Sequence, residues 1–522
     1  YQRRVRGNTM EDRQMRKQDL DMYQSFAQFF TEDIRLKIQS ETNKRMSRIF
    51  NYNENMTQEE WQKFWSILML MMLEPRRVVK QYWSNDNFFN NPVIKRILPR
   101  DMFLQILNHL CATDQEIFFM PVSRLVQNAQ THKEVNYLHV SEEQQAAFDK
   151  YCDEHQLPRG QYWEMFEYST LESFKWIEDA LREAFQKTKI KIDSYCLDES
   201  LIAFKGRVKF RQYLPAKPKK WGILLRMLCD SDTKLVYDFK LYKGKENPEE
   251  TTKLFDVCQE MLEKPITKAK EDSMPFTLYC DNLYTSVELA DHIADDGNML
   301  VGTVRTNRLG RHDWQQLKMH NYKLFRTKYN NKRYHHLIWQ ARGKKKPVNM
   351  LSTVNPRDLD IDFFDDDYFK PILIENYNKN KTGVDCVDQR CRHYQFPHKC
   401  QRWTTYVLMH LLSMCLHNGH ILYKRERFFE NCDISFYDYV EGIARYLGNI
   451  YDDAKVHSKK IDQFLEVHQL TSIAKNPKVP QKKESKCLMC EHATRWSCLC
   501  GTIWCQKCYL HHLLENYSKR LE

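Results

Sequence analysis

The spacing of hydrophobic residues changes near Lys189. Before that point apolar residues recur every three to four positions, as in 59–73, where Thr57 precedes the run at an N-cap position. After it come short β-rich runs, separated in their later part by helical stretches. We expect strands over 190–201, 221–229, 235–242, 276–280 and 299–304, and helices over 252–262 and 285–293. This order predicts an α/β fold of mixed layers after a helical first part.

The same patterns divide the 522 residues into segments. Dense mixed charge without apolar periodicity predicts a flexible arm at the start, and lysines with two prolines mark a linker near the end. The predicted segments are a charged arm (1–20), a first helical part (21–189), a first core part (190–305), a basic irregular part (306–371), a second core part (372–394), a second helical part (395–473), a linker (474–486) and a cysteine-rich end (487–522).

Composition narrows the class of protein. The chain carries 80 Lys and Arg against 69 Asp and Glu, a formal charge of +11, which suggests a polyanionic partner. Its longest apolar run, 67–73, is far shorter than the roughly 20 residues of a membrane span. No signal-peptide pattern opens the sequence, so we expect no secretory route and no disulfide framework.

Two predicted strands end in an aspartate. Asp198 follows Tyr-Cys-Leu, and Asp281 follows Thr-Leu-Tyr-Cys. With a third acid from a helix, Asp385 or Asp388, such residues would hold hard divalent cations through oxygen ligands. One metal would activate a water, and the other would stabilise the leaving oxygen of a phosphodiester. The alternative is that each Asp caps the turn or helix after its strand, and spacing alone favours this for any single Asp.

The residues around these acids resemble the piggyBac family of DNA transposases. Asp-Glu-Ser-Leu-Ile-Ala-Phe-Lys-Gly-Arg (198–207) is similar to the first catalytic block of the family, and Cys-Asp-Asn-Leu-Tyr-Thr-Ser (280–286) to the second. Gly-Val-Asp-Cys-Val-Asp-Gln (383–389), with Arg402-Trp403 downstream, is similar to the third, although Lys381-Thr382 replaces the usual Met-Gly. The resemblance covers about residues 20–515 in the order of the family.

This resemblance implies an RNase H-like catalytic core in which Asp198, Asp281 and Asp385 bind two Mg²⁺ or Mn²⁺ ions, with Asp388 as a fourth acidic contributor. The segment 306–371 would be an insertion domain looping out of the core sheet. The two helical parts would form one split domain for dimerisation and DNA binding. The implied activity is cleavage of transposon ends through a hairpin and insertion at TTAA, by a nuclear protein that is at least a homodimer.

The cysteine-rich end predicts two zinc ions, because eight soft ligands fall within a segment too short to fold on a core of its own. The expected ligands are Cys487, Cys490, Cys498, Cys500, Cys505, Cys508, His511 and His512. We expect a cross-brace with the first, second, fifth and sixth of these cysteines on one zinc, while His492 is an alternative to either terminal histidine. The resemblance implies that the module binds terminal transposon DNA, but RING and PHD modules of similar composition bind protein.

Basic residues beside the first acid are candidate phosphate contacts. Lys205 and Arg207 belong to an alternating basic run, and Lys217 and Lys219 follow it. A solvated surface is the alternative. Trp403 beside Arg402 is a candidate for stacking on an unpaired base, although a Trp on an apolar helix is more often core. The resemblance favours the DNA role.

The leading interpretation is an active transposase. The runner-up is a domesticated relative, acting either as a host nuclease in programmed DNA elimination or as a DNA-binding protein without catalysis. A zinc-dependent ubiquitin ligase is a third class, which the RNase H-like blocks argue against. All three catalytic acids are present, which favours an enzyme.

Overall fold

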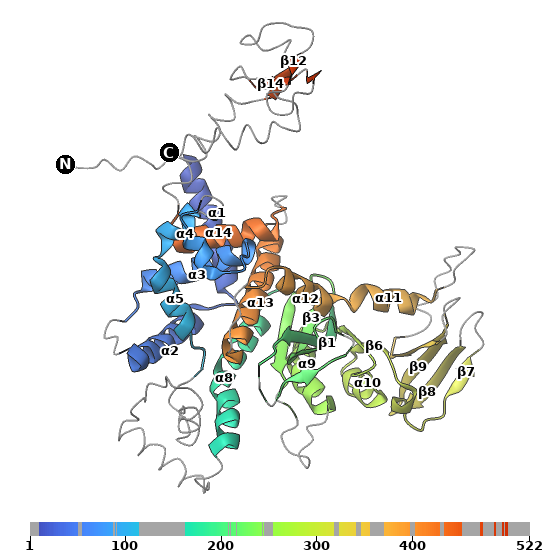
Figure 1. Ribbon diagram of the computed structural model, residues 1–522. Helices are drawn as coiled ribbons and strands as arrows, with labels where there is room; N and C mark the ends of the chain where they lie inside the picture. The colour runs from blue at the N-terminus through green and yellow to red at the C-terminus, as the bar shows by residue number, and fades with distance from the viewer. Residues whose placement is uncertain are drawn as a thin grey trace, which may run out of the picture. The chain divides into compact units, whose positions relative to one another are not determined.

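The computed structural model, drawn as a ribbon in Figure 1, describes residues 10–50, 55–86, 89, 91–113, 162–206, 208, 210–215, 217–242, 244, 254–317, 323–340, 346–354, 370–396, 402–427, 433–450, 470–472, 485–486, 493–494 and 496–498. The chain divides into two units, residues 17–448 and residues 1–16 with 449–522. Among the helices described, none combines the length and the apolar character that a membrane crossing requires.

The first helical part consists of helices, as its hydrophobic spacing predicts. They are α1 (Met10–Ala27), α2 (Glu32–Phe50), α3 (Gln58–Leu73), η1 (Val79–Trp83), α4 (Pro92–Ile97), α5 (Arg100–His109) and α8 (Tyr162–Gln186). The helix predicted over 59–73 is confirmed as α3, and Thr57 is its N-cap. Thr57 and Glu60 form a reciprocal capping box that satisfies two backbone N–H groups at the start of the helix.

The predicted flexible arm is shorter than expected, because α1 begins at Met10. Asp19 on this helix is buried and accepts two hydrogen bonds from the guanidinium of Arg445, at 2.9 and 3.0 Å. Arg445 lies 426 residues away in sequence, so an arginine far along the chain neutralises the charge of Asp19. That charge had suggested a solvated arm. The arm prediction is therefore wrong for residues 10–20.

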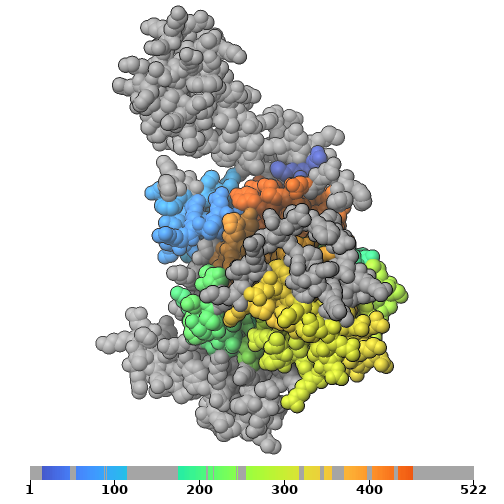
Figure 2. All heavy atoms as spheres, turned by 90° about the vertical axis from the view of Figure 1, so that its right-hand side faces the viewer, coloured from blue at the N-terminus to red at the C-terminus, as the bar shows by residue number. Residues whose placement is uncertain are grey.

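Helices from the second helical part pack on those of the first (Figures 1 and 2). They are α13 (Trp403–Glu426) and α14 (Phe436–Gly448). The Ser66 hydroxyl on α3 donates to the carbonyl of Ala444 on α14 at 2.7 Å, and the hydroxyls of Ser25 and Tyr439 lie 2.8 Å apart. Segments more than 370 residues apart in sequence thus share one helical core.

Within the described residues, ten strands form one sheet. They are β1 (Ser194–Ala203), β2 (Gln212–Tyr213), β3 (Trp221–Asp230), β4 (Val236–Leu241), β5 (Thr277–Cys280), β6 (Met299–Thr303), β7 (Gln315–Leu317), β8 (Lys323–Tyr329), β9 (Lys332–Trp339) and β10 (Val348–Ser352). The strand order is β2-β3-β1-β5-β6-β10-β9-β8-β7, and β4 also pairs with β3. The mixed α/β fold predicted from the sequence is confirmed, with parallel pairing only between β1 and β5 and between β5 and β6 among these strands.

Helices cover both faces of this sheet (Figure 1). On one face, α9 (Leu254–Glu271) and α10 (Val287–Ala294) pack on Tyr195 and Leu197 of β1. On the other face, α12 (Gly383–His393) contacts β1 and β3, and α11 (Ile372–Asn380) contacts β1 and β6. Successive side chains of β1 alternate between these layers, so its odd and even residues have different surroundings.

The segment 306–371 differs from the prediction. Instead of an irregular loop outside the sheet, it contributes η3 (Thr306–Arg308) and the meander β7 to β10, in which β10 pairs antiparallel with β6. The meander extends one end of the sheet and does not separate β1 from β5. Its strands are hidden in the sequence because His335 and His336 are buried, and burial lowers the pKa of His335 to about 4 and also lowers that of His336. Neutral imidazoles here take the place of apolar strand residues.

Two short antiparallel pairs are described beyond residue 450. β11 (Leu470–Ser472) pairs with β14 (Trp496–Cys498), and β12 (Ser485–Lys486) pairs with β13 (Ala493–Thr494). Apart from these strand residues, the cysteine-rich end and its predicted cross-brace lie outside the described residues. The predicted zinc ligands therefore stay a prediction.

Candidate active site

Two of the predicted acids lie side by side because of the register of the sheet. β1 and β5 pair in parallel, with Leu197 opposite Cys280. The next residues along the two strands are Asp198 and Asp281, and β5 ends at Cys280. Both acids therefore lie side by side at the carboxyl end of β5, although β1 continues past Asp198 to Ala203.

The third acid is brought to this edge by a close approach of α12. A Cβ at Gly383 would lie 2.3 Å from Sγ of Cys196 and 3.1 Å from Cβ of Cys229, so only glycine allows the helix to begin on β1 and β3. Hydrogen bonding to Cys229 and from the backbone N–H groups of Val384 and Gly383 lowers the pKa of the Cys196 thiol. Asp385 lies in the first turn of this helix.

The pKa of Asp198 reflects both its burial and the charges of the two other acids. Burial raises the pKa of Asp198 to about 6, and the negative charges of Asp281 and Asp385 act in the same direction. The backbone N–H of Glu199 and the ammonium of Lys217 oppose this rise. Asp198 is thus exposed to the negative charge of two acids from distant segments, an unfavourable environment that a bound cation would relieve.

The donor set fits a hard divalent cation, since all of its side chains are carboxylates. Among the residues that the structure describes, no three side chains of Asp, Glu, His or Cys are arranged to hold a metal ion together. Asp198 and Asp281 each accept a backbone N–H instead, from Glu199 at 2.7 Å and from Leu283 at 2.8 Å. The alternative role predicted for these acids, capping the next turn, is therefore also realised at Asp281.

Asp388 lies one turn after Asp385 and is buried against β1. It accepts a hydrogen bond from the Ser200 hydroxyl, and Nη2 of Arg392 lies 3.1 Å from its other oxygen. Burial raises its pKa, while Ser200 and Arg392 act against the rise. The hydrogen bond with Ser200 holds α12 on β1, a central strand of the sheet, while Arg392 belongs to α12 itself.

Glu199 is a further buried carboxylate, next to Asp198 in sequence, that the sequence patterns did not indicate. Burial raises its pKa to about 7, and the charges of Asp198 and Asp281 add to this rise. It follows Asp198 directly, so it points to the opposite face of the sheet, where Arg226 is its cross-strand partner in register. In the sequence, this pair was indicated only by a Glu directly after Asp198 and an Arg on the next predicted strand.

The anchor of α12 was also missed. The guanidinium of Arg390 lies 3.0 Å from Nδ1 of His417 and 3.5 Å from Nδ1 of His420. The Nε2 atoms of these histidines lie 2.8 and 3.0 Å from the carbonyl oxygens of Lys234 and Ile434. Burial lowers the pKa of His417 to about 3 and of His420 to about 4, so both rings are neutral acceptors for Arg390. In the sequence, this contact was indicated only by two histidines three residues apart on an apolar helix.

Comparison with known proteins identifies the family. The family model of transposase IS4 matches residues 21–420, well over half of the chain. The chain belongs to this family, in its piggyBac branch. The human PiggyBac transposable element-derived protein 3 is 21% identical over 337 residues, which cover 62% of this chain and 55% of the relative. The human Chimeric ERCC6-PGBD3 protein is also 21% identical, over 31% of its length.

A solved structure shares the fold of this piggyBac family member. The piggyBac transposase in a synaptic complex with hairpin DNA, solved by cryo-electron microscopy, superposes with a TM-score of 0.59 at 19% identity. The match covers 85% of this chain and 84% of that one. At this identity the match establishes the fold, while the curated relatives are spanned over only 55% and 31% of their own length.

The basic residues predicted to contact DNA have different surroundings in this family member. Nζ of Lys217 donates to the carbonyl of Glu199 at 2.9 Å, which ties its loop to the acidic site. Lys219 lines a cavity of about 30 Å³ with Asp388 and Arg392. Lys205 is exposed, and Arg207 lies outside the described residues.

The contacts of Arg402 and Trp403 differ from those predicted for a base-stacking pair. The guanidinium of Arg402 donates to the carbonyls of Leu107, Asn108 and Leu110 at the end of α5, at distances from 2.7 to 3.3 Å. Trp403 is 9% exposed and packs on the rings of Phe174 and Phe210. Both side chains join helices of the two helical parts, so the more common core role of such a Trp applies here.

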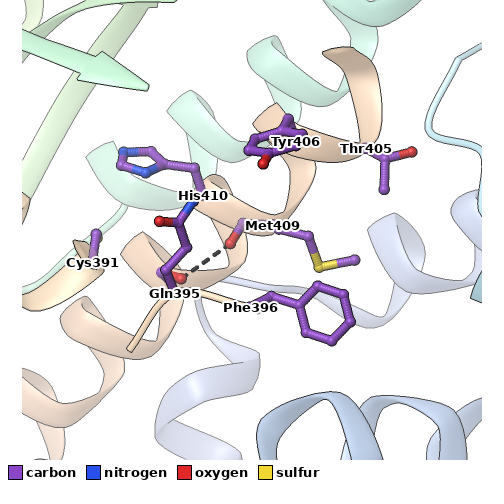
Figure 3. A pocket seen from close by; sticks show the side chains of 8 residues that line it. Cys391, Gln395, Phe396, Thr405, Tyr406, Met409 and His410 are labelled. Atoms are coloured by element: carbon purple, nitrogen blue, oxygen red, sulfur yellow. Dashed lines mark hydrogen bonds between the residues drawn. The ribbon is translucent and has the colours of Figure 1, made fainter. Parts of the chain in front are cut away.

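A small cavity lies between α12 and α13 of the piggyBac-type fold (Figure 3). Its volume of about 20 Å³ has room for little more than one water. His410 and Thr405 line it, and within the described residues neither Nε2 of His410 nor Oγ1 of Thr405 has a hydrogen-bond partner. This cavity is too small for a nucleotide and does not extend the acidic site.

Proposed function

We propose that this chain is a DDD-type DNA transposase that cleaves DNA and joins it to a target in a reaction dependent on divalent metal ions. The observation that carries the proposal is the placement of the acids: β1 and β5 put Asp198 beside Asp281, and α12, which begins on β1 and β3, carries Asp385 in its first turn. Membership of the transposase family supports the same reaction class.

The order of strands supports an RNase H-like core. β4, β3 and β1 are antiparallel neighbours, and β5 and β6 continue the sheet parallel to β1. Asp198 lies within β1, Asp281 follows the end of β5, and α12, which packs on β1, carries Asp385 in its first turn. The meander β7 to β10 is then the insertion, built as an extension of the core sheet.

The three acids would hold two Mg²⁺ or Mn²⁺ ions. When bound, such ions supply an activated water and stabilise the leaving 3′ oxygen of a phosphodiester. Asp388 ties α12 to β1 through Ser200, so the position of Asp385 depends on it. Lys217 belongs to the basic loop that follows β2, and its ammonium is bonded to the carbonyl of Glu199. In this position it would meet the phosphates of a bound strand.

The details of the reaction are carried over from the family resemblance. We propose cleavage at the terminal inverted repeats through a hairpin, insertion at TTAA, action in the nucleus, and a homodimer or higher oligomer that joins two ends. The solved neighbour is described as a synaptic complex with hairpin DNA, which supports the hairpin. The split helical domain would provide the dimer contact.

The cysteine-rich end would bind two zinc ions and contact terminal DNA. Elemental analysis of the purified full chain should give two zinc ions per chain, and Cys505→Ser should remove at least one of them. A full chain with fewer than two zinc ions would contradict this assignment.

A domesticated role is the second candidate. The human relative is named a transposable element-derived protein, which shows that this family includes such members. A host nuclease would cut DNA without inserting it, and a non-catalytic DNA-binding protein would bind without cutting. Assays of cutting and of strand transfer on the same substrate separate the three functions.

The catalytic assignment predicts the behaviour of isosteric variants. Asp198→Asn, Asp281→Asn and Asp385→Asn should each reduce Mg²⁺-dependent nicking of a TTAA-bearing DNA end by at least about 100-fold, since each loses a charged metal ligand. DNA binding should persist. Asp232→Asn, which changes an exposed loop acid, is the matched control and should cut at the wild-type rate. An Asp281→Asn protein with full activity would remove this triad from the proposal.

A further inference from the structure

Two exposed aromatic rings form a pair at the start of β3. Tyr213 and Trp221 are cross-strand partners in register, with ring centroids 4.7 Å apart. They are 47% and 45% exposed, more than most of the large hydrophobic side chains that reach the surface in the described residues. The guanidinium of Arg211 lies 4.5 Å from the centre of the Trp221 ring and also donates to the carbonyls of Lys205 and Gly206. Arg211 therefore fixes the indole in place.

All charged residues in the segment around this pair are basic. Residues 204–222 contain seven Lys and Arg and no Asp or Glu. Lys219 and Lys220 precede Trp221 directly, and both are exposed. An exposed aromatic platform among cations is complementary to a nucleic acid strand, because the rings stack on bases and the cations meet phosphates.

The sheet register gives the distance of the pair from the acidic site. Asp198 lies opposite Met227 on β3, and Trp221 lies six residues earlier on that strand. At about 3.3 Å per residue this is roughly 20 Å. A strand stacked as in a duplex advances about 3.4 Å per nucleotide, so the pair lies roughly six stacked nucleotides from the acids. Lys217 and Lys219 occupy the interval, the first bonded to Glu199 and the second beside Asp388.

We propose that Tyr213 and Trp221 form a stacking site for an unpaired nucleobase of the DNA strand whose cleaved phosphate lies at the acidic site. The base must be unpaired or terminal, because bases within a duplex already stack on their neighbours and present no free ring face. The inference deepens the proposed function and rests on its DNA binding, but it does not depend on catalysis.

The test uses the full chain and a TTAA-bearing duplex with a single-stranded overhang. 2-Aminopurine, whose fluorescence is quenched by stacking, is placed at successive overhang positions. Binding of the wild-type protein should quench the probe most strongly about six nucleotides from the TTAA. Tyr213→Ala and Trp221→Ala should abolish this local quenching and weaken binding to overhang DNA roughly ten-fold. Binding to the blunt duplex should change by less than about two-fold.

Two further variants keep the test decisive. Trp221→Phe retains an aromatic ring and should retain most of the quenching even if the alanine variant folds poorly. Tyr437→Ala changes a tyrosine on α14 that is 37% exposed, and it should leave both readouts unchanged. Quenching that survives Tyr213→Ala and Trp221→Ala, or that Tyr437→Ala removes equally, would overturn the stacking site.

The outcome is separable from that of the proposed function. Loss of quenching in the Tyr213 and Trp221 variants of a protein that never cuts DNA would support the stacking site and contradict the catalytic proposal. A protein that cuts DNA but shows no quenching at any position would support the catalytic proposal and contradict the stacking site.

Discussion

At the residue scale, the acidic site is defined by carboxylates that are costly to ionise together. Burial raises the pKa of Asp198 to about 6 and that of Glu199 to about 7, with neighbouring carboxylates adding to each rise. Their ordinary values are 3.8 and 4.5, so between about pH 4 and pH 7 the native state binds protons that the unfolded chain has released. The free energy of unfolding of the metal-free protein should therefore fall as the pH rises through this window.

This prediction is measured by urea unfolding in EDTA at pH 4.5 and pH 7.5. Wild-type protein should lose more stability over this range than Asp198→Asn, by on the order of 2 kcal/mol, because the variant has no charge to bury. Added Mg²⁺ should reduce the difference by binding only the native site. The Asp232→Asn control should follow the wild type. Equal pH dependence in wild type and Asp198→Asn would contradict the shared site.

Residue patterns predicted the positions of the acids but not their surroundings. Asp198 and Asp281 were found because each comes directly after a short apolar run, and this depends on local sequence alone. Trp403 was misassigned because its partners, Phe174 and Phe210, are about 200 residues away and leave no local signal. The exposed pair Tyr213 and Trp221 was missed for the same reason, since cross-strand register is needed to see it.

At the scale of elements, α12 is held by contacts that only the fold reveals. Arg390 is bonded to two neutral histidines of α13, and these are bonded in turn to the carbonyls of Lys234 and Ile434. Protonation of His417 or His420 would place a second positive charge beside Arg390. Their lowered pKa values mean that the unfolded chain binds protons before the native state does, below about pH 6.5.

Stability should therefore fall on the acid side in a manner that depends on this cluster. Urea unfolding between pH 7 and pH 5 should show the wild type losing about 1 to 2 kcal/mol per pH unit more than the double variant His417→Gln, His420→Gln. The variant is expected to start less stable at pH 7, since glutamine cannot reproduce both bonds of the imidazole. His312→Gln, at a histidine outside the cluster, should keep the wild-type slope. Parallel slopes for wild type and the double variant would show that the cluster does not couple folding to pH.

Elements were predicted well where one face is apolar and poorly where burial depends on neutralised polar groups. The strands β1, β3, β4, β5 and β6 and the helices α3, α9 and α10 match the expected segments. The meander β7 to β10 was read as irregular because its buried histidines count as polar in sequence. The start of α1 was misplaced because the charge on Asp19 is balanced by a distant arginine.

At the scale of the whole molecule, function depends on distant segments reaching one edge of a sheet. The parallel pairing of β1 and β5 puts Asp198 beside Asp281, and the close approach at Gly383 places the start of α12, which carries Asp385, on β1 and β3. Sequence could indicate three acids and, through resemblance, their common role. It could not predict that the insertion would continue the same sheet, because antiparallel pairing with β6 is set by the meander and not by any local pattern.

The central claim is that these three acids form one metal site, and iron-directed backbone cleavage tests it most directly. Fe²⁺ bound in place of Mg²⁺ produces hydroxyl radicals with ascorbate and peroxide, and these cut only the backbone nearest the metal. Mass spectrometry of the fragments should show cuts near residues 198, 281 and 385 together, suppressed by excess Mg²⁺ and lost in Asp281→Asn. Cuts confined to one of these segments, or unchanged in Asp281→Asn, would contradict a shared site.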